Sequence, residues 1–282
     1  GFYLAVDLAK KEGADFILGS DPDADRVGIM VRTSDGEFKV LTGNQTGVLL
    51  LDYLIGAKQR TGKMPANPVA LKTIVTTEMA RKVAETNGLK SYDTFTGFKF
   101  LAEKKDKLEN AGEGKVIFAY EESYGYMLGD YVRDKDAVNA ALLVCEMAAH
   151  YKLEGKTLCA VMDELYAEYG TYYTKADSFA FAGAGAMERM GAVMDHLRAE
   201  HLPEIAGTAV TGFTDYRDTS ATGLPSADVL TWELADGCAV TARPSGTEPK
   251  LKLYFTVRAG SREECLQRYD ALRAAMTGAA GL

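Results

Sequence analysis

The chain has 282 residues, of which 47% are hydrophobic and 26% are charged, and its formal net charge is −8. This composition is that of a globular protein large enough for two or three domains. The acidic balance argues against a nucleic-acid or anionic-membrane surface, and no apolar run is long enough to span a bilayer. The four cysteines and three histidines form no zinc-binding pattern, so we expect a reduced, cytoplasmic protein.

The first part of the chain alternates predicted helices and strands. The predicted apolar face of the first helix consists of Leu4, Ala5, Leu8 and Ala9, and Asn44 is predicted to cap the second helix. Helices are predicted at 3–12, 44–60, 78–86, 98–110, 136–151 and 157–169, and strands at 15–20, 28–32, 37–41, 69–75, 89–95 and 115–120. From about residue 69 this alternation predicts a mostly parallel sheet covered on both faces.

From about residue 171 the pattern changes to strands grouped between two helices. Strands are predicted at 172–181, 208–216, 229–234, 237–242 and 250–257, and helices at 185–200 and 262–276. Residues 251–257 alternate apolar and polar side chains, as a one-sided antiparallel strand does. We therefore expect a separate α+β domain with an antiparallel sheet.

An acidic turn, Asp21-Pro22-Asp23-Ala24-Asp25-Arg26, follows the strand at 15–20. Three carboxylates spaced two residues apart in a non-helical turn can converge on a hard cation such as Mg²⁺. Arg26 adds a fixed positive charge that could hold a phosphate. An ordinary acidic surface turn between two strands explains the same residues.

A second polar loop, Tyr120-Glu121-Glu122-Ser123-Tyr124-Gly125-Tyr126, follows the strand at 115–120. In an extended loop, Glu121 and Ser123 point the same way, and a carboxylate beside a hydroxyl can bind two adjacent sugar hydroxyls. A polar loop with locally packed tyrosines is the alternative.

A third loop, residues 243–250 (RPSGTEPK), lies between two predicted strands. Arg243, Ser245, Thr247 and the amides around Gly246 can all donate to one phosphate. A turn rich in Pro, Gly and Ser explains this stretch as well.

The order and joint presence of the three loops resemble the α-D-phosphohexomutase superfamily, the phosphoglucomutases and phosphomannomutases. The resemblance covers essentially the whole chain and implies part of a four-domain fold. It implies a C-terminal remnant of the metal-binding second domain at 1–42, an α/β sugar-binding third domain at 43–168 and an α+β phosphate-binding fourth domain at 169–282. The implied activity interconverts hexose 1-phosphate and 6-phosphate through a phosphoserine and a bisphosphorylated sugar, with glucose or mannose phosphates and hexose 1,6-bisphosphate as partners.

The resemblance also assigns roles to residues. Lys99 lies in a Thr-Gly-Phe-Lys-Phe stretch, and Arg133 lies in the segment after the second loop, residues 120–126, which we call the sugar loop. The implied roles are Mg²⁺ binding by Asp21, Asp23 and Asp25, catalysis by Arg26 and Lys99, and substrate binding by Glu121, Ser123, Arg133, Arg243, Ser245, Gly246 and Thr247. Solvated charges at helix ends are the alternative for Lys99 and Arg133.

One departure from the family pattern matters for activity. The family transfers phosphate through a serine in a Ser-His-Asn context, and none of the three histidines here follows a serine. We therefore expect the 282 residues to be inactive alone, as part of a longer enzyme. Two other functions stay open: a magnesium-dependent phosphatase with Asp21 as nucleophile, and a noncatalytic phosphosugar-binding module. The oligomeric state and the identity of the sugar are not readable from the sequence.

Overall fold

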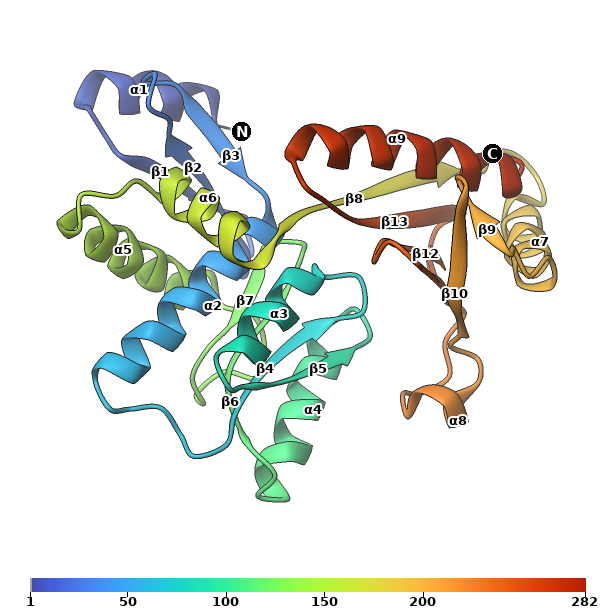
Figure 1. Cartoon of the computed structure of the whole chain (residues 1–282), viewed down its shortest axis with the longest axis horizontal. Coiled ribbons are helices and arrows are strands. Elements are labelled where there is room, and N and C mark those ends of the chain that lie inside the picture. Colours follow the sequence, from blue (N-terminus) through green and yellow to red (C-terminus); the bar gives the residue numbers. More distant parts are fainter. Residues whose placement is uncertain (1) are drawn as a thin grey trace. The chain divides into compact units, whose positions relative to one another are not determined.

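The computed structural model describes residues 2–282 and divides into two compact units, Gly1–Tyr169 and Gly170–Leu282 (Figure 1). The first unit holds two sheets and the second holds one. The structure is mixed α/β in the first unit and antiparallel α+β in the second, as the sequence predicts. Whether residues 1–42 and 43–168 are separate domains stays a prediction.

The first sheet is a small antiparallel one that carries the acidic turn. It is formed by β1 (Phe16–Ser20), β2 (Val27–Arg32) and β3 (Phe38–Leu41), in the order β1-β2-β3, and it is preceded by α1 (Tyr3–Glu12). The predicted apolar face of α1 is confirmed only in part: Ala9 is buried and Ala5 is half-buried, but Leu4 and Leu8 are 87% and 58% exposed. The helix therefore turns its two leucines to the outside, away from the sheet that it accompanies.

The second sheet is mostly parallel and carries the sugar loop. Its strands are β4 (Pro68–Thr73), β5 (Lys90–Thr94), β6 (Lys115–Glu121) and β7 (Gly125–Met127), in the order β5-β4-β6-β7. The first three pair in parallel, whereas β7 runs antiparallel to β6. The sequence did not predict β7, because a three-residue strand is too short to show a periodic pattern.

Five helices accompany this sheet: α2 (Gly43–Arg60), α3 (Glu78–Thr86), α4 (Phe98–Asn110), α5 (Ala137–Leu153) and α6 (Leu158–Tyr169). Leu101 and Leu108 of α4 pack with Val69 and Leu71 of β4 in one buried cluster. α2 approaches β6 so closely that a Cβ on Gly47 would lie 2.1 Å from the Tyr120 ring. This contact explains why glycine occupies a position in the middle of a helix.

The cap of α2 differs from the prediction. Thr42 is the N-cap, and its hydroxyl accepts from the Gln45 amide while the Gln45 side chain accepts from the Thr42 amide. This reciprocal capping box places the N-cap two residues before the expected Asn44. Asn44 is buried instead, and its Oδ1 accepts a hydrogen bond from the Thr77 amide 3.0 Å away.

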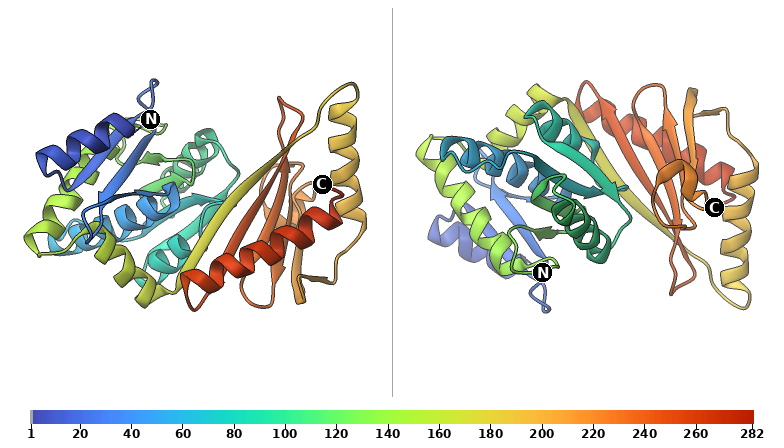
Figure 2. Two further views of the ribbon diagram at one scale, coloured as in Figure 1. Left: turned by 90° about the horizontal axis from the view of Figure 1, so that it is seen from above. Right: turned by 90° about the horizontal axis from the view of Figure 1, so that it is seen from below.

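The second unit is built on a six-stranded antiparallel sheet. Its elements are β8 (Thr171–Ala180), α7 (Ala186–Ala199), β9 (Glu204–Ile205), β10 (Thr208–Asp215), α8 (Thr219–Thr222), β11 (Leu230–Leu234), β12 (Ala239–Pro244), β13 (Lys250–Ala259) and α9 (Arg262–Ala279). The strand order is β8-β13-β12-β11-β10-β9. Ser261 caps α9 by accepting from the Glu264 amide, and Figure 2 shows this helix lying across the sheet.

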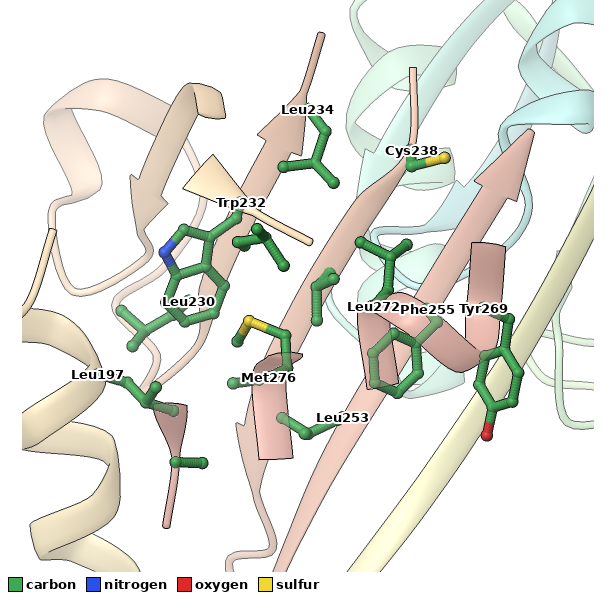
Figure 3. Packing of buried hydrophobic residues seen from close by; sticks show 14 of the residues in the cluster. Leu197, Leu230, Trp232, Leu234, Cys238, Leu253, Phe255, Tyr269, Leu272 and Met276 are labelled. Carbon is green, nitrogen blue, oxygen red and sulfur yellow. The ribbon is translucent and has the colours of Figure 1, made fainter. Parts of the chain in front are cut away.

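The core of the second unit lies on one face of this sheet. Leu251, Leu253, Phe255 and Val257 of β13 are at most 1% exposed, as the alternation predicts, but Tyr254 on the other face is also buried, with 7% exposure, so the strand is not strictly one-sided. They pack with Trp232 of β11 and with α7 and α9 (Figure 3). Arg243 of β12 pairs with Lys252 one position away from the buried Ala242–Leu253 pair, so it belongs to the opposite face.

Within residues 2–282, no helix is long and apolar enough to cross a membrane.

Candidate functional site

The acidic turn connects β1 to β2 and is closed by its own first carboxylate. Oδ1 of Asp21 accepts hydrogen bonds from the amides of Arg26 and Asp25, at 3.1 and 3.2 Å. These bonds, that from Arg26 foremost, hold the pKa of Asp21 below its usual value. Ala24 takes a left-handed conformation with φ of 56°, which lets the chain reverse within the turn.

A lysine that the sequence reasoning missed lies against this turn. Nζ of Lys135 is 2.8 Å from Oδ2 of Asp25, whereas Nε of Arg26 is 3.9 Å from Oδ1 of the same carboxylate. Burial by itself lowers the pKa of Lys135, but the hydrogen bond to Asp25 and the charges of Asp134 and Asp25 outweigh it and raise the pKa. Lys135 is therefore a charged partner of the turn.

The donor chemistry of the turn fits a hard divalent cation, because all three side chains offer carboxylate oxygens. Their present arrangement does not gather them: among residues 2–282, no three Asp, Glu, His or Cys side chains are placed to hold one ion. Asp21 is engaged with backbone amides, Asp25 with Lys135, and Asp23 is exposed. The three carboxylates therefore do not converge on one point in this conformation, although their spacing allows it. Their role in binding Mg²⁺ stays a prediction.

The sugar loop is a tight hairpin between β6 and β7, with Glu121 paired to Gly125. The Glu121 side chain is only 7% exposed, and its carboxylate accepts a hydrogen bond from the Gly97 amide at the start of α4. The carboxylate of Glu122 instead accepts from the hydroxyls of Thr76 and Thr73, at 3.3 and 3.4 Å. Burial and the neighbouring Glu121 raise the pKa of Glu122.

The hairpin fixes the positions of these residues through two separate elements. The Glu121 carboxylate is held at the N-terminus of α4, and the Glu122 carboxylate is held at the end of β4. Ser123, the next residue in the chain, is half-buried. Tyr124 takes a left-handed φ of 67°. The loop is thus anchored by two neighbouring carboxylates, Glu121 to α4 and Glu122 to the threonines at and after the end of β4.

The structure brings the sugar loop and the acidic turn together. Arg26 forms a β-bridge with Gly125, and the Val27 amide donates to the Tyr124 carbonyl at 3.2 Å. Gly125 is packed tightly here: a Cβ on it would lie 2.6 Å from the Phe98 ring and 2.9 Å from Cδ of Lys135. Residues about 100 positions apart in the sequence therefore form one site in the first unit.

The two weaker candidates have simpler surroundings. Lys99 is exposed in the first turn of α4, with Nζ 4.8 Å from the centroid of the Phe100 ring. Arg133 pairs with Asp106 of α4 at 2.9 Å, and its side chain is 51% exposed. Neither contact joins these side chains to the acidic turn, and their catalytic and binding roles stay predictions.

The third loop of the sequence analysis, residues 243–250, lies in the second unit between β12 and β13, and we call it the phosphate loop. Oγ of Ser245 accepts from the amides of Glu248 and Thr247, at 3.3 and 3.4 Å, and the Ser245 amide donates to the Lys250 carbonyl. Gly246 has open space where a Cβ would be. The Arg243 guanidinium makes no ion pair within the described part of the chain, although Lys250 pairs with Glu248. The phosphate loop thus combines the Arg243 guanidinium, backbone amides and the hydroxyls of Ser245 and Thr247 in one short stretch.

Comparison with known proteins identifies a family and several relatives that this chain resembles. Residues 42–169 match the family described as phosphoglucomutase/phosphomannomutase, alpha/beta/alpha domain III. A phosphoglucomutase of Staphylococcus aureus strain N315 is 34% identical over 280 residues, which are 96% of this chain and 50% of that protein. The chain thus spans about half the length of the curated relatives it matches.

Solved structures share the fold. The Paramecium phosphoglucomutase pp63/parafusin superposes over 100% of this chain and 50% of its own, with a TM-score of 0.69 at 19% identity. An Aspergillus fumigatus N-acetylphosphoglucosamine mutase, solved in complex with GlcNAc-6P and magnesium, covers 98% of this chain and 55% of its own, with a TM-score of 0.52 at 15% identity. The three loops, the matching domain and these relatives place the chain in the α-D-phosphohexomutase superfamily, to which it belongs.

Proposed function

We propose that these 282 residues supply the sugar-binding and distal-phosphate-binding parts of a phosphohexomutase. The enzyme would interconvert hexose 1-phosphate and 6-phosphate through a phosphoserine and a bisphosphorylated sugar. The observation that carries the proposal is the contact between the sugar loop and the acidic turn, made by the Arg26–Gly125 bridge and the Val27–Tyr124 hydrogen bond. This contact supports the proposal because a phosphohexomutase needs its sugar-hydroxyl receptor beside the charges that assist phosphoryl transfer.

The roles of the residues follow from their chemistry. Glu121 and Ser123 would accept and donate hydrogen bonds to adjacent sugar hydroxyls. Arg243, Ser245, Thr247 and the Gly246 amide would hold the phosphate that is not being transferred. Arg26 and Lys99 would support the transferring phosphoryl group.

Asp21, Asp23 and Asp25 would hold a magnesium ion, as the magnesium in the Aspergillus relative suggests. When bound, such an ion offsets the negative charge that develops during phosphoryl transfer. Oδ1 of Asp21 is held by two amides, which suits a turn-forming ligand better than the nucleophile of a phosphatase.

The phosphoserine would come from polypeptide outside these residues. Two helices of the first unit support this, because they expose large apolar side chains. These are Tyr3 (88% exposed), Leu4 (87%) and Leu8 (58%) of α1, and Val138 (72%), Leu142 (68%) and Leu153 (90%) of α5. Exposed apolar side chains gathered on two helices are typical of a surface that packs against more protein.

Two measurements test the proposal. In a coupled assay that follows conversion of glucose 1-phosphate to glucose 6-phosphate, the 282-residue chain should show no turnover. Robust turnover would contradict an external serine. In calorimetric titration with glucose 6-phosphate, Arg243→Ala should raise Kd roughly tenfold, the effect of losing a charge-assisted phosphate contact.

The control for the binding measurement is Arg262→Ala, which removes an exposed arginine from the first turn of α9 in the same unit. It should leave Kd within about twofold of the unaltered chain, because a solvated charge away from the loop contributes little. Titration with glucose completes the test. If Arg243→Ala weakened glucose binding as much as glucose 6-phosphate binding, Arg243 would have no specific phosphate role.

A further inference from the structure

The acidic turn already has a cation, which is part of the protein. Nζ of Lys135 lies 2.8 Å from Oδ2 of Asp25, and the lysine side chain is only 16% exposed. The ammonium is 5.5 Å from the centroid of the Phe98 ring, and the aliphatic part of the side chain packs against Gly125. This pair is partly removed from solvent, where the interaction between charges is screened less.

Another lysine–aspartate pair of the same unit shows the contrast. Lys152 lies 2.6 Å from Asp15, which directly precedes β1, but the two side chains are 70% and 61% exposed. A pair of that kind contributes little because water and salt screen it. The two lysine–aspartate distances are similar, but the Lys135–Asp25 pair is less exposed to solvent than the Lys152–Asp15 pair. Of these two lysines, only Lys135 contacts the acidic turn.

Lys135 also belongs to the segment of residues 128–136, which joins β7 to α5. Asp130 of this segment accepts from Lys115 and Lys105, at 2.6 and 2.7 Å, and Arg133 pairs with Asp106 at 2.9 Å. These contacts hold the segment to α4 and to β6 of the second sheet. Lys135 ties the same segment to the acidic turn of the other sheet.

A divalent cation on Asp25 would meet the Lys135 ammonium at the same carboxylate. Two cations on one carboxylate repel each other, and this repulsion is strong in a partly buried site. We propose that Lys135 is a resident counter-ion of the acidic turn, which competes with a divalent cation for Asp25 and so couples cation binding to segment 128–136. The inference rests on the proposed cation-binding role of the turn.

The proposal predicts how cation binding at Asp25 changes the stability of segment 128–136, and how loss of the Lys135 charge changes cation affinity. When a cation takes Asp25, Lys135 loses its partner in the turn, and segment 128–136 keeps its ties to α4, β6, β7 and α5. The amides of this segment should then open more often. Conversely, removing the ammonium should leave Asp25 free for the cation and raise the affinity of the turn.

The experiment titrates the full chain with Mn²⁺ and follows free Mn²⁺ by electron paramagnetic resonance. Lys135→Met, which keeps the length of the side chain but not its charge, should lower Kd roughly tenfold, equivalent to about 1.4 kcal/mol. Lys135→Arg, which keeps the charge, should stay within about threefold of the unaltered chain. Lys152→Met is the matched control and should change Kd by less than about twofold.

Amide hydrogen exchange supplies a second readout that needs no catalysis. Mn²⁺ should speed exchange in residues 128–136 of the unaltered chain. In Lys135→Met, exchange there should already be fast without Mn²⁺ and should not rise further. Urea unfolding of each variant checks that the fold is retained.

The possible failures can be told apart. If Asp23→Asn weakens Mn²⁺ binding but Lys135→Met leaves it unchanged or weaker, the turn binds the cation and the counter-ion proposal is overturned. If neither the unaltered chain nor Lys135→Met binds Mn²⁺, the proposal and the metal role of the turn both fail. In that case, the Arg243 titration still tests phosphosugar binding separately.

Discussion

The acidic turn and the phosphate loop are both short polar connections between antiparallel strands, yet they are held in different ways. The phosphate loop is shaped mainly by its own residues: Oγ of Ser245 accepts two amides from the next three residues, and its amide donates to Lys250. Apart from strand pairing, its one backbone bond from a distant residue in the described chain lies at its end, where the Phe181 amide donates to the Pro249 carbonyl. The acidic turn closes on Asp21, but it is positioned by Gly125 and Lys135, more than 90 residues later in the chain. A loop can thus be organised mainly by its own residues or mainly by distant parts of the fold, and a change far from the loop should affect the second kind more.

Matched glycine substitutions test this comparison most strongly. Gly125→Ala should destabilise the first unit by about 2 kcal/mol, because the new Cβ would lie 2.6 Å from the Phe98 ring and 2.9 Å from Cδ of Lys135. Gly246→Ala should change stability by less than about 0.5 kcal/mol, because a Cβ there meets open space. Urea unfolding measures both. Equal effects would mean that the acidic turn is no more dependent on distant packing than the phosphate loop.

A half-buried carboxyl, Asp52 of α2, extends the comparison from loops to helices. Burial, and then the charge of Glu168, raise the pKa of Asp52 from 3.8 to about 6. Between about pH 4 and 6 the folded chain keeps a proton that the unfolded chain releases, so this group should make stability fall as pH rises through that window. Asp52→Asn should remove that slope and stabilise the first unit by about 1–2 kcal/mol at pH 7.

Thermal unfolding at a series of pH values measures the effect of Asp52→Asn. The exposed Asp163 of α6 provides the control, since Asp163→Asn should leave the slope between pH 4 and 6 unchanged. An unaltered slope in Asp52→Asn would show that burial on α2 does not govern this pH dependence.

The smallest expected effect concerns the local organisation of the phosphate loop. Ser245→Ala removes the acceptor of two amide hydrogen bonds and should cost about 1 kcal/mol, with faster hydrogen exchange at Thr247 and Glu248. Exchange at Asp25 and Arg26 of the acidic turn should not change. Exchange that stayed slow at Thr247 and Glu248 would show that other contacts maintain this loop.

Much of the fold could be predicted because its signals are local. The helices at 78–86 and 98–110 begin and end where the periodicity and the turn residues place them, and α9 begins at the predicted residue 262. The alternation in β13 reports directly which side chains are buried, since successive residues of a strand point to opposite faces. The predictions failed where the local signal was ambiguous, as at the cap of α2 and at the apolar face of α1.

Lys135 shows why part of the site could not be predicted. Its neighbours in the sequence, Asp134 and Asp136, make it resemble an ordinary charge before a helix, and Arg133 was the more obvious candidate. Arg133 pairs with Asp106, whereas Lys135 reaches Asp25, 110 positions earlier. No pattern in one sequence specifies a contact of that range, because it depends on how two sheets pack.

The sequence by itself determined the types of chemistry present: three carboxylates, a glutamate–serine loop and an Arg-Ser-Gly-Thr loop, each next to a strand with a readable pattern. These features depend on composition and on spacings of a few residues. Only the tertiary structure decided that Gly125 bridges to Arg26, that Lys135 neutralises Asp25, and that the three carboxylates of the turn do not converge in this conformation. The physical reason is that short-range spacing limits which groups can meet, whereas packing between distant elements selects which of them do.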